Sequence, residues 1–102
     1  MLNQVVLMGR LAKEVEIIDK EKNEGILTLA VPRTYKNKDN VYETDFIDCF
    51  IAGGVTEGVA NYCKKGDTIA VRGSLKTEVI DDKKILQLIV DKVSFLSSKK
   101  ED

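Results

Sequence analysis

One segment of the sequence has helical spacing, and strand-like runs lie on both sides of it. This arrangement restricts the possible folds of the chain more than any other feature. From Val55 to Lys65, apolar side chains recur at helical intervals at Val55, Val59 and Tyr62, and the segment ends in two lysines followed by Gly66. This order is typical of a helix C-terminus. We therefore expect one short helix of about three turns in an otherwise β-rich chain.

Three strand-like runs precede this helix and two follow it. We expect strands over residues 3–11, 26–31, 41–52, 68–80 and 85–96. Pro32, the only proline, cannot donate to a ladder and indicates a strand end or edge. The polar residues 36–40 have turn composition, so the second and third runs are predicted to be arms of one long hairpin. Residues 19–25 and 81–83 are predicted as a loop or hairpin tip and as a charged turn.

The order of three strands, one helix and two strands predicts an all-β fold, the five-stranded OB-fold barrel with its helix between strands three and four. Such barrels bind oligonucleotides or oligosaccharides on the face of strands two and three. An unrelated α+β sheet has the same order of elements and stays open at this point. The 102 residues suffice for one domain, which we place at 1–97, with a short polar end at 98–102.

The composition excludes several classes of site. The chain has no histidine, and Cys49 and Cys63 lie far from any metal-binding spacing, so we expect buried thiols, no metal, no cofactor and no catalytic centre. The apolar runs fall short of the ~20 residues of a membrane span, and we expect a cytoplasmic protein. The net charge of −1 lacks the basic surplus of many nucleic-acid-binding proteins, although a basic face can exist within a neutral total.

Alternation assigns a mixed aromatic and charged composition to the outer face. In residues 46–52 the inner phase is uniformly apolar, whereas the outer phase carries Phe46, Asp48 and Phe50. The outer phases of the first and fourth runs add Arg10, Arg72 and Lys76. Aromatic rings interleaved with cations are the surface by which proteins bind single-stranded nucleic acid. The alternative is that both phenylalanines fill a second small core or a subunit interface.

Other residues allow a functional and a structural interpretation. Arg33, Tyr35 and Lys36 on the long hairpin are either a phosphate-binding arm or a solvated tip. Lys64 and Lys65 are predicted to complement the helix dipole, and Tyr62 is predicted to close the base of the barrel. Outward-pointing Val6 and Met8 predict self-association.

Five segments of the chain closely resemble, in the same order, the bacterial single-stranded DNA-binding proteins. They are MLNQVVLMGRL at 1–11, LAVPRTY at 29–35, TDFIDC at 44–49, VANYCKKG at 59–66 and VRGSLKT at 71–77. The resemblance implies an OB fold, a homo-oligomer that is often a tetramer, and sequence-tolerant binding of single-stranded DNA in replication, recombination or repair. It also implies a location on the DNA of the nucleoid.

The resemblance places base-stacking aromatics at Tyr35 and Phe46 and puts four cations in segments that line the DNA path. Together with the alternation, it gives the predicted DNA-binding residues Arg10, Arg33, Tyr35, Lys36, Phe46, Phe50, Arg72 and Lys76. The chain departs from the family where Ala52 and Ile80 replace aromatics, where Glu78 replaces a basic residue, and where Asp48 adds a negative charge. These changes predict reduced affinity, for which Phe50 compensates in part.

The chain stops at Asp102 without the long acidic tail of many relatives, so no tail-mediated recruitment of replication partners is expected. In this respect the chain resembles the short members of the family that belong to competence systems, phages or mobile elements. Primosomal replication protein N, a dimeric relative, is of similar length. An accessory subunit that acts mainly through protein contacts is therefore the alternative function.

Overall fold

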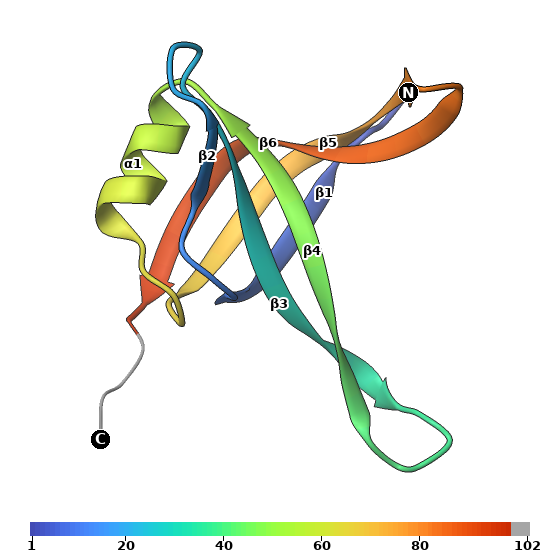
Figure 1. Ribbon diagram of the computed structural model, residues 1–102. Coiled ribbons are helices and arrows are strands. Elements are labelled where there is room, and N and C mark those ends of the chain that lie inside the picture. The colour runs from blue at the N-terminus through green and yellow to red at the C-terminus, as the bar shows by residue number, and fades with distance from the viewer. Residues whose placement is uncertain (99–102) are drawn as a thin grey trace.

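The strand-forming runs become six strands in a computed structural model that describes residues 1–98. The elements are β1 (Val5–Leu11), β2 (Glu16–Asp19), β3 (Glu24–Lys36), β4 (Tyr42–Ala52), α1 (Gly54–Tyr62), β5 (Thr68–Ile80) and β6 (Lys83–Ser97) (Figure 1). The predicted helix thus lies between two long hairpins. Residues 99–102 of the predicted polar end at 98–102 lie outside the described residues.

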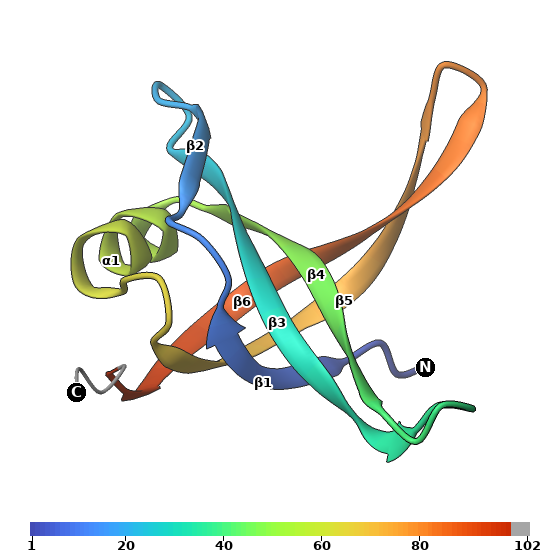
Figure 2. The same ribbon diagram turned by 60° about the horizontal axis from the view of Figure 1, so that its bottom comes forward.

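Five of these strands close into a barrel. The sheet runs in the order β1-β5-β6-β4-β3, and β1 closes it by pairing with β3 at Arg10↔Ala30 and Leu11↔Leu29 (Figure 2). β4 and β6 pair in parallel at Cys49↔Leu88, and the other pairs are antiparallel. The predicted OB-fold barrel with a helix between its third and fourth strands is therefore confirmed, and the open α+β sheet is excluded.

The sequence pattern did not indicate β2, which forms a short hairpin with β3 at Ile17↔Gly25. Its turn is fixed by the Asp19 carboxylate, which accepts a hydrogen bond from the backbone N–H of Lys22 at 3.0 Å. Asn23 has a φ of 55°, a left-handed conformation that asparagine tolerates. The predicted loop is therefore shorter than residues 19–25 and is flanked by a strand on each side.

The predicted end of the second strand at Pro32 is wrong, because β3 continues to Lys36. β1 pairs with β3 only as far as Ala30, so the edge of β3 that faced β1 has no strand partner at Pro32. A missing N–H is tolerated at such an edge. The regular register with β4 also breaks after Pro32↔Thr44. Proline therefore marks an edge and an irregularity here, not an end.

The helix is shorter than predicted and ends at Tyr62. Cys63 is already extended and points into the core, and the next turn is held by Asp67, whose carboxylate accepts from the Lys64 N–H at 2.8 Å. Lys64 and Lys65 lie beyond the last helical turn, so their predicted role at the helix dipole is wrong. Tyr62 is 81% exposed and does not close the barrel.

The barrel interior is filled by aliphatic side chains and two thiols from all five barrel strands, from α1 and from Cys63 just after α1. Fully or nearly fully buried are Leu11, Leu27, Leu29, Cys49, Ile51, Val59, Cys63, Ile69, Val71, Leu88 and Val90. Each buried leucine or isoleucine contributes roughly 1.5–3 kcal/mol relative to exposure. Both cysteines are buried and free, as predicted.

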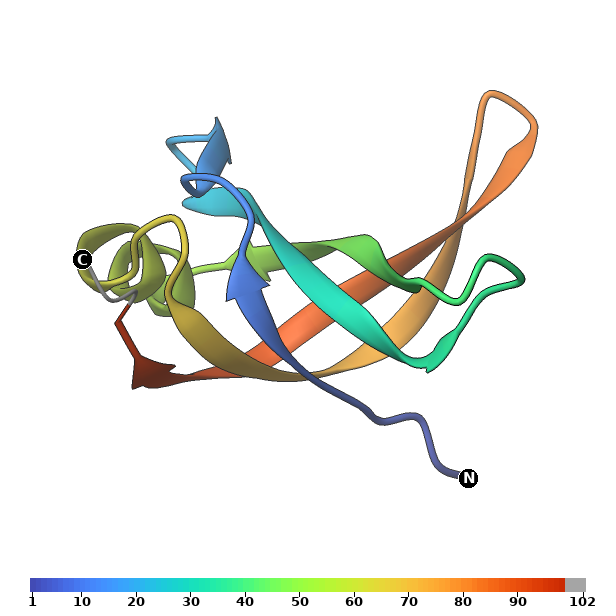
Figure 3. The same cartoon turned by 90° about the horizontal axis from the view of Figure 1, so that it is seen from below.

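The β3–β4 and β5–β6 hairpins both project from the side of the barrel away from α1 (Figure 3). β1 accompanies β5 only as far as Val5↔Gly73, and beyond that pair β5 leaves the barrel. Leu75, which lies beyond this pair, is therefore 41% exposed. Asp81 and Asp82 both have positive φ, which is the geometry of a two-residue type I′ hairpin turn.

Candidate nucleic-acid interface

The outer face of β4 carries two phenylalanines with an aspartate between them. We call Phe46, Asp48 and Phe50 the aromatic strip. The alternate residues of β4 point inward, and Cys49 and Ile51 are buried in the barrel core. Phe46 is 68% exposed, whereas Phe50 is half-buried. The alternation predicted for this strand is thus observed, and the core is complete without Phe46.

Arg10 lies in the same cross-strand row as Phe46. Ala30 of β3 pairs with Phe46 on one side and with Arg10 of β1 on the other. Neighbouring strands lie about 4.8 Å apart, so the two side chains leave the barrel about 10 Å from each other, across a small alanine. Among residues 1–98, no ion pair neutralises Arg10.

A hollow of about 510 Å³ lies in this region, between Met8, Arg10, Ala30 and Thr44. Gly9 permits the close approach of β1 to β3 at this point, because a Cβ atom there would come within 2.5 Å of the Ala30 carbonyl oxygen. The close crossing of β1 and β3 therefore brings the Arg10 cation to the aromatic side of the barrel.

Phe50 and Lys76 come together in a second groove. This groove has a volume of about 310 Å³, separates β4 from the β5–β6 hairpin, and is also lined by Glu24, Glu78 and Gln87. Phe50 is half-buried and pairs in register with Ile89 of β6, which also lines the groove. Lys76 forms no ion pair with any other described residue. The groove therefore presents one aromatic ring, one cation and two carboxylates.

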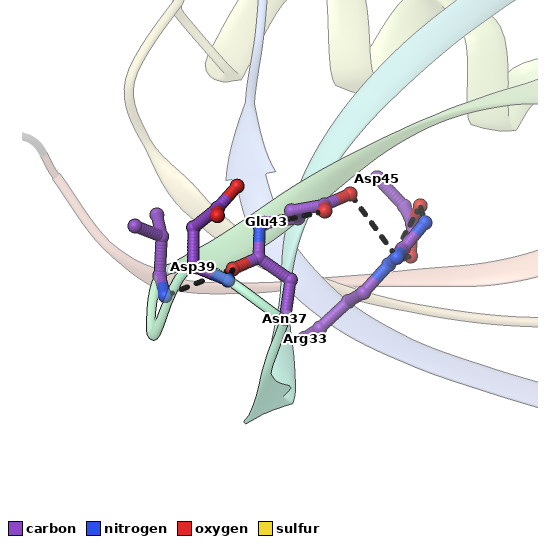
Figure 4. Close-up of polar contacts among 6 residues, drawn as sticks. Arg33, Asn37, Asp39, Glu43 and Asp45 are labelled. Atoms are coloured by element: carbon purple, nitrogen blue, oxygen red, sulfur yellow. Dashed lines mark hydrogen bonds and ion pairs between the residues drawn. The ribbon is translucent and has the colours of Figure 1, made fainter.

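Arg33, on the long hairpin, is held by carboxylates of the opposite strand (Figure 4). Its Nε donates to Asp45 Oδ2 at 3.1 Å, its Nη2 donates to Asp45 Oδ1 at 2.9 Å, and its Nη1 lies 3.2 Å from Glu43 Oε2. The hydrogen bond and charge of Asp45 raise the pKa of Arg33 further, and the hydrogen bond from Arg33 lowers the pKa of Asp45. Two carboxylates thus neutralise this predicted phosphate-binding cation.

The tip of the same hairpin is ordered by Asn37. Its Oδ1 accepts the N–H groups of Asp39 and Val41 at 2.9 and 3.0 Å, and its Nδ2 donates to Glu43 Oε1 at 2.9 Å (Figure 4). Next to the tip, Lys36 Nζ lies 5.6 Å from the ring centroid of Tyr42, within the range of a cation–π contact.

Tyr35 is exposed near the end of β3. Tyr35 and Lys36 therefore lie together on one projecting arm, and no carboxylate pairs with Lys36 among the described residues.

Arg72 lies apart from the aromatic strip. It pairs in register with Val6 of β1 and with Lys92 of β6, so β6 separates it from β4. Together with Ala70 and Ser94 these residues line a hollow of about 200 Å³. The structure therefore brings Arg10 towards Phe46 and Lys76 towards Phe50, but it does not bring Arg72 to either ring.

Two further residues of the same type were not predicted from the sequence. Tyr42 is exposed, and its ring lies under Lys36. Like Phe46 and Phe50 it has an even number in β4, so extending the alternation from Phe46 by two steps would have identified it. Lys92 lies opposite Arg72. Because the register of β5 and β6 shifts between Arg72 and Gly73, the alternation pattern does not predict the position of Lys92.

Within residues 1–98, no three His, Cys, Asp or Glu side chains lie close enough together to hold a metal ion. In the same part of the chain, no helix is long and apolar enough to cross a membrane.

The profile of the Single-strand binding protein family matches residues 2–96 of this chain. The chain belongs to the single-strand binding protein family. Single-stranded DNA-binding protein 2 of Staphylococcus aureus strain COL is 38% identical, over 97% of this chain and 76% of the relative. Single-stranded DNA-binding protein 1 of Streptococcus pyogenes is 38% identical, over 91% and 73%. The resemblance found in the sequence is thereby confirmed.

A solved structure described as the Plasmodium falciparum SSB complex with ssDNA has the same fold as this single-strand binding family member. It superposes with a TM-score of 0.77 at 24% identity, over 95% of this chain and 96% of the other.

Proposed function

We propose that this chain binds single-stranded DNA with little dependence on base order, and that it protects exposed strands in replication, recombination or repair on the DNA of the nucleoid. Membership of the single-strand binding protein family supports this function. The relatives that match most of the chain carry the printed name single-stranded DNA-binding protein. The bound strand lies against the outer face of the barrel.

The observation that carries this proposal is Phe46, a large aromatic ring that is mostly exposed on a folded face, in the same row as Arg10, a cation that forms no ion pair among residues 1–98. A ring in this position stacks a base, since every base has a π-face, and each stacked base contributes about 1–3 kcal/mol. Phe50 offers a second, partly covered ring further along β4. Tyr35 offers a third on the projecting arm.

The predicted DNA-binding cations divide into three groups by their ion-pair partners and their position. Arg10, Lys36 and Lys76 form no ion pair within residues 1–98 and are assigned to phosphates along the strip and the arm. Arg33 is assigned a weaker part because Asp45 and Glu43 already hold it. Arg72 is assigned to the edge of the interface, beside Lys92.

The test is a titration of oligo-dT at several salt concentrations. Each phosphate neutralised by a cation contributes about −0.7 to the slope of log affinity against log salt for single strands, so three free cations predict a slope of about −2. A slope near zero would contradict phosphate contact by these side chains. The absence of binding even at low salt would overturn the function itself.

We also propose that the chain forms a homo-oligomer, a dimer or tetramer, through β1. Val6 and Met8 are 68% and 61% exposed on adjacent outer positions of β1, an apolar surface that self-association would cover. Light scattering at tens of micromolar should give a mass above that of one chain. Val6→Glu, placed next to Arg72, should lower this mass while the far-UV circular dichroism stays unchanged; a monomeric wild-type chain would contradict the proposal.

A further inference from the structure

Asp48 occupies the middle of the aromatic strip, between Phe46 and Phe50. Its Oδ1 accepts a hydrogen bond from the Thr28 hydroxyl at 2.7 Å, which fixes the carboxylate on the outer face between β3 and β4. Asp48 is exposed, and its Oδ2 forms no hydrogen bond with any described residue. No cation pairs with it among residues 1–98. One acceptor oxygen is therefore oriented and available.

This placement brings the free oxygen near any base that stacks on the strip. Successive same-face residues of a strand lie about 6.7 Å apart, so Asp48 is one such step from each phenylalanine. A base stacked on either ring extends several ångströms beyond it, and its polar edge then lies within reach of the carboxylate. Towards phosphate, by contrast, the Asp48 charge is repulsive. Its favourable contacts are therefore with hydrogen-bond donors on bases.

We infer that Asp48 gives the aromatic strip a preference for bases that present an amino group, cytosine over thymine in particular. This inference rests on the proposed function. An ionised carboxylate only accepts hydrogen bonds. Cytosine presents the N4 amino donor where thymine presents the O4 acceptor, and aspartate is a recognised acceptor for cytosine N4. Binding thus tolerates any base order, with a bias in base composition set by one side chain.

The experiment compares the affinities of fluorescently labelled dC, 5-methyl-dC and dT homo-oligomers of about 15 nucleotides, near the upper site size of one OB fold. The 5-methyl-dC oligomer controls for the thymine methyl group, which changes stacking. Measured by anisotropy at one fixed salt concentration, both cytosine oligomers should bind about fivefold more tightly than dT, the effect of about one net hydrogen bond.

Asp48→Asn is the decisive variant, because its amide oxygen still accepts from Thr28 and its NH₂ group donates to thymine O4. The dT affinity should rise, because the negative charge is removed and a donor to thymine O4 is gained, and the ratio of dC to dT affinity should fall to about one. Asp91→Asn is the matched control: it removes the same charge from an exposed residue beside α1, outside the strip. Its affinities should keep the wild-type ratio. Thr28→Val, which frees the carboxylate to rotate, should reduce the ratio part-way.

The outcomes separate this inference from the proposed function. If the wild-type chain binds dC and dT equally, or if Asp48→Asn keeps the wild-type ratio, the assigned role of Asp48 is overturned while single-strand binding stands. If none of the oligomers binds, the proposed function fails and the inference fails with it. A ratio that falls equally in Asp91→Asn would mean that total charge, not the position of Asp48, sets the preference, and this also overturns the inference.

Discussion

Arg33 and Asp45 form a two-point ion pair across the β3–β4 hairpin, Nε to Oδ2 at 3.1 Å and Nη2 to Oδ1 at 2.9 Å. Fork-to-fork contacts of this kind are among the stronger polar contacts in proteins. The pair links the two strands of the projecting arm. At the same time it neutralises a cation of the predicted DNA path. The Asp45 carboxylate and a DNA phosphate therefore compete for the same guanidinium.

A double-mutant cycle tests this competition. In the wild-type background, Arg33→Ala should weaken oligo-dT binding by less than about twofold, since Asp45 and Glu43 already neutralise the guanidinium. In an Asp45→Asn, Glu43→Gln background, Arg33 is released, and its removal should cost about tenfold and reduce the salt slope by about 0.7. Equal losses in both backgrounds, measured by anisotropy, would show that Arg33 contacts phosphate despite its carboxylate partners.

The pH dependence of this tie follows from the lowered pKa of Asp45. A carboxyl group whose folded-state pKa is depressed adds stability above its unfolded pKa, and this is lost as the pH falls through the folded-state value. The β3–β4 arm should therefore loosen only below the ordinary range for aspartate. Amide hydrogen exchange of residues 33–45 as the pH is lowered would report this, and Asp45→Asn should remove the dependence.

Substitution by alanine should have opposite effects on stability at two glycines, Gly73 and Gly58. At Gly73 a Cβ atom would collide with the backbone carbonyl of Ile89, at a register shift between β5 and β6. Gly73→Ala should therefore destabilise the barrel by about 3 kcal/mol or more, since backbone cannot move aside cheaply. Gly58 in α1 has open space around its Cβ position, so Gly58→Ala should stabilise by about 0.5–1 kcal/mol. Denaturant unfolding of both variants checks this pair.

The barrel was predictable from the sequence because its strands are regular where they are half-buried. From residue 46 to residue 51 of β4 the odd positions are uniformly apolar, whereas the even positions mix aromatic and charged side chains, so two-residue alternation identifies both the strand and its faces. The end of α1 was not predictable in the same way. Lys64 and Lys65 suit a helical last turn, but the Asp67 carboxylate takes the Lys64 N–H and Cys63 enters the core. A tertiary contact thus overrides a local signal.

The candidate site was predictable in its residue types but not in its pairings. Alternation placed Phe46, Phe50 and Arg10 on outer faces, and the structure agrees. It did not show that Arg33 meets Asp45, because that contact depends on the register shift between Pro32 and Lys36 in the hairpin. Turn composition indicates a hairpin without fixing its register. Cross-strand ion pairs are consequently invisible until the register is known.

Cys49 predicts a loss of stability at alkaline pH. Burial, with the nearby charge of Asp48, raises the pKa of its thiol from 9.0 to about 11. Because the unfolded chain deprotonates first, stability is complete below pH 9 and falls as the pH rises towards about 11, by about 2 kcal/mol. Guanidinium unfolding at several pH values should show this decline, and Cys49→Ala should show a smaller one. An identical decline in both proteins would assign it to other groups.

Alanine variants of the two phenylalanines in the aromatic strip test most directly whether each ring binds DNA or packs in the fold. Phe46→Ala should weaken oligo-dT binding by about 1–3 kcal/mol and leave the melting temperature nearly unchanged, because the ring is mostly exposed. Phe50→Ala should lower both the oligo-dT affinity and the melting temperature, because that ring is half-buried. Tyr62→Ala, which removes an even more exposed ring from α1, should change neither. If Phe46→Ala melts several degrees early yet binds like the wild type once folded, the ring belongs to packing and the interface lies on another face.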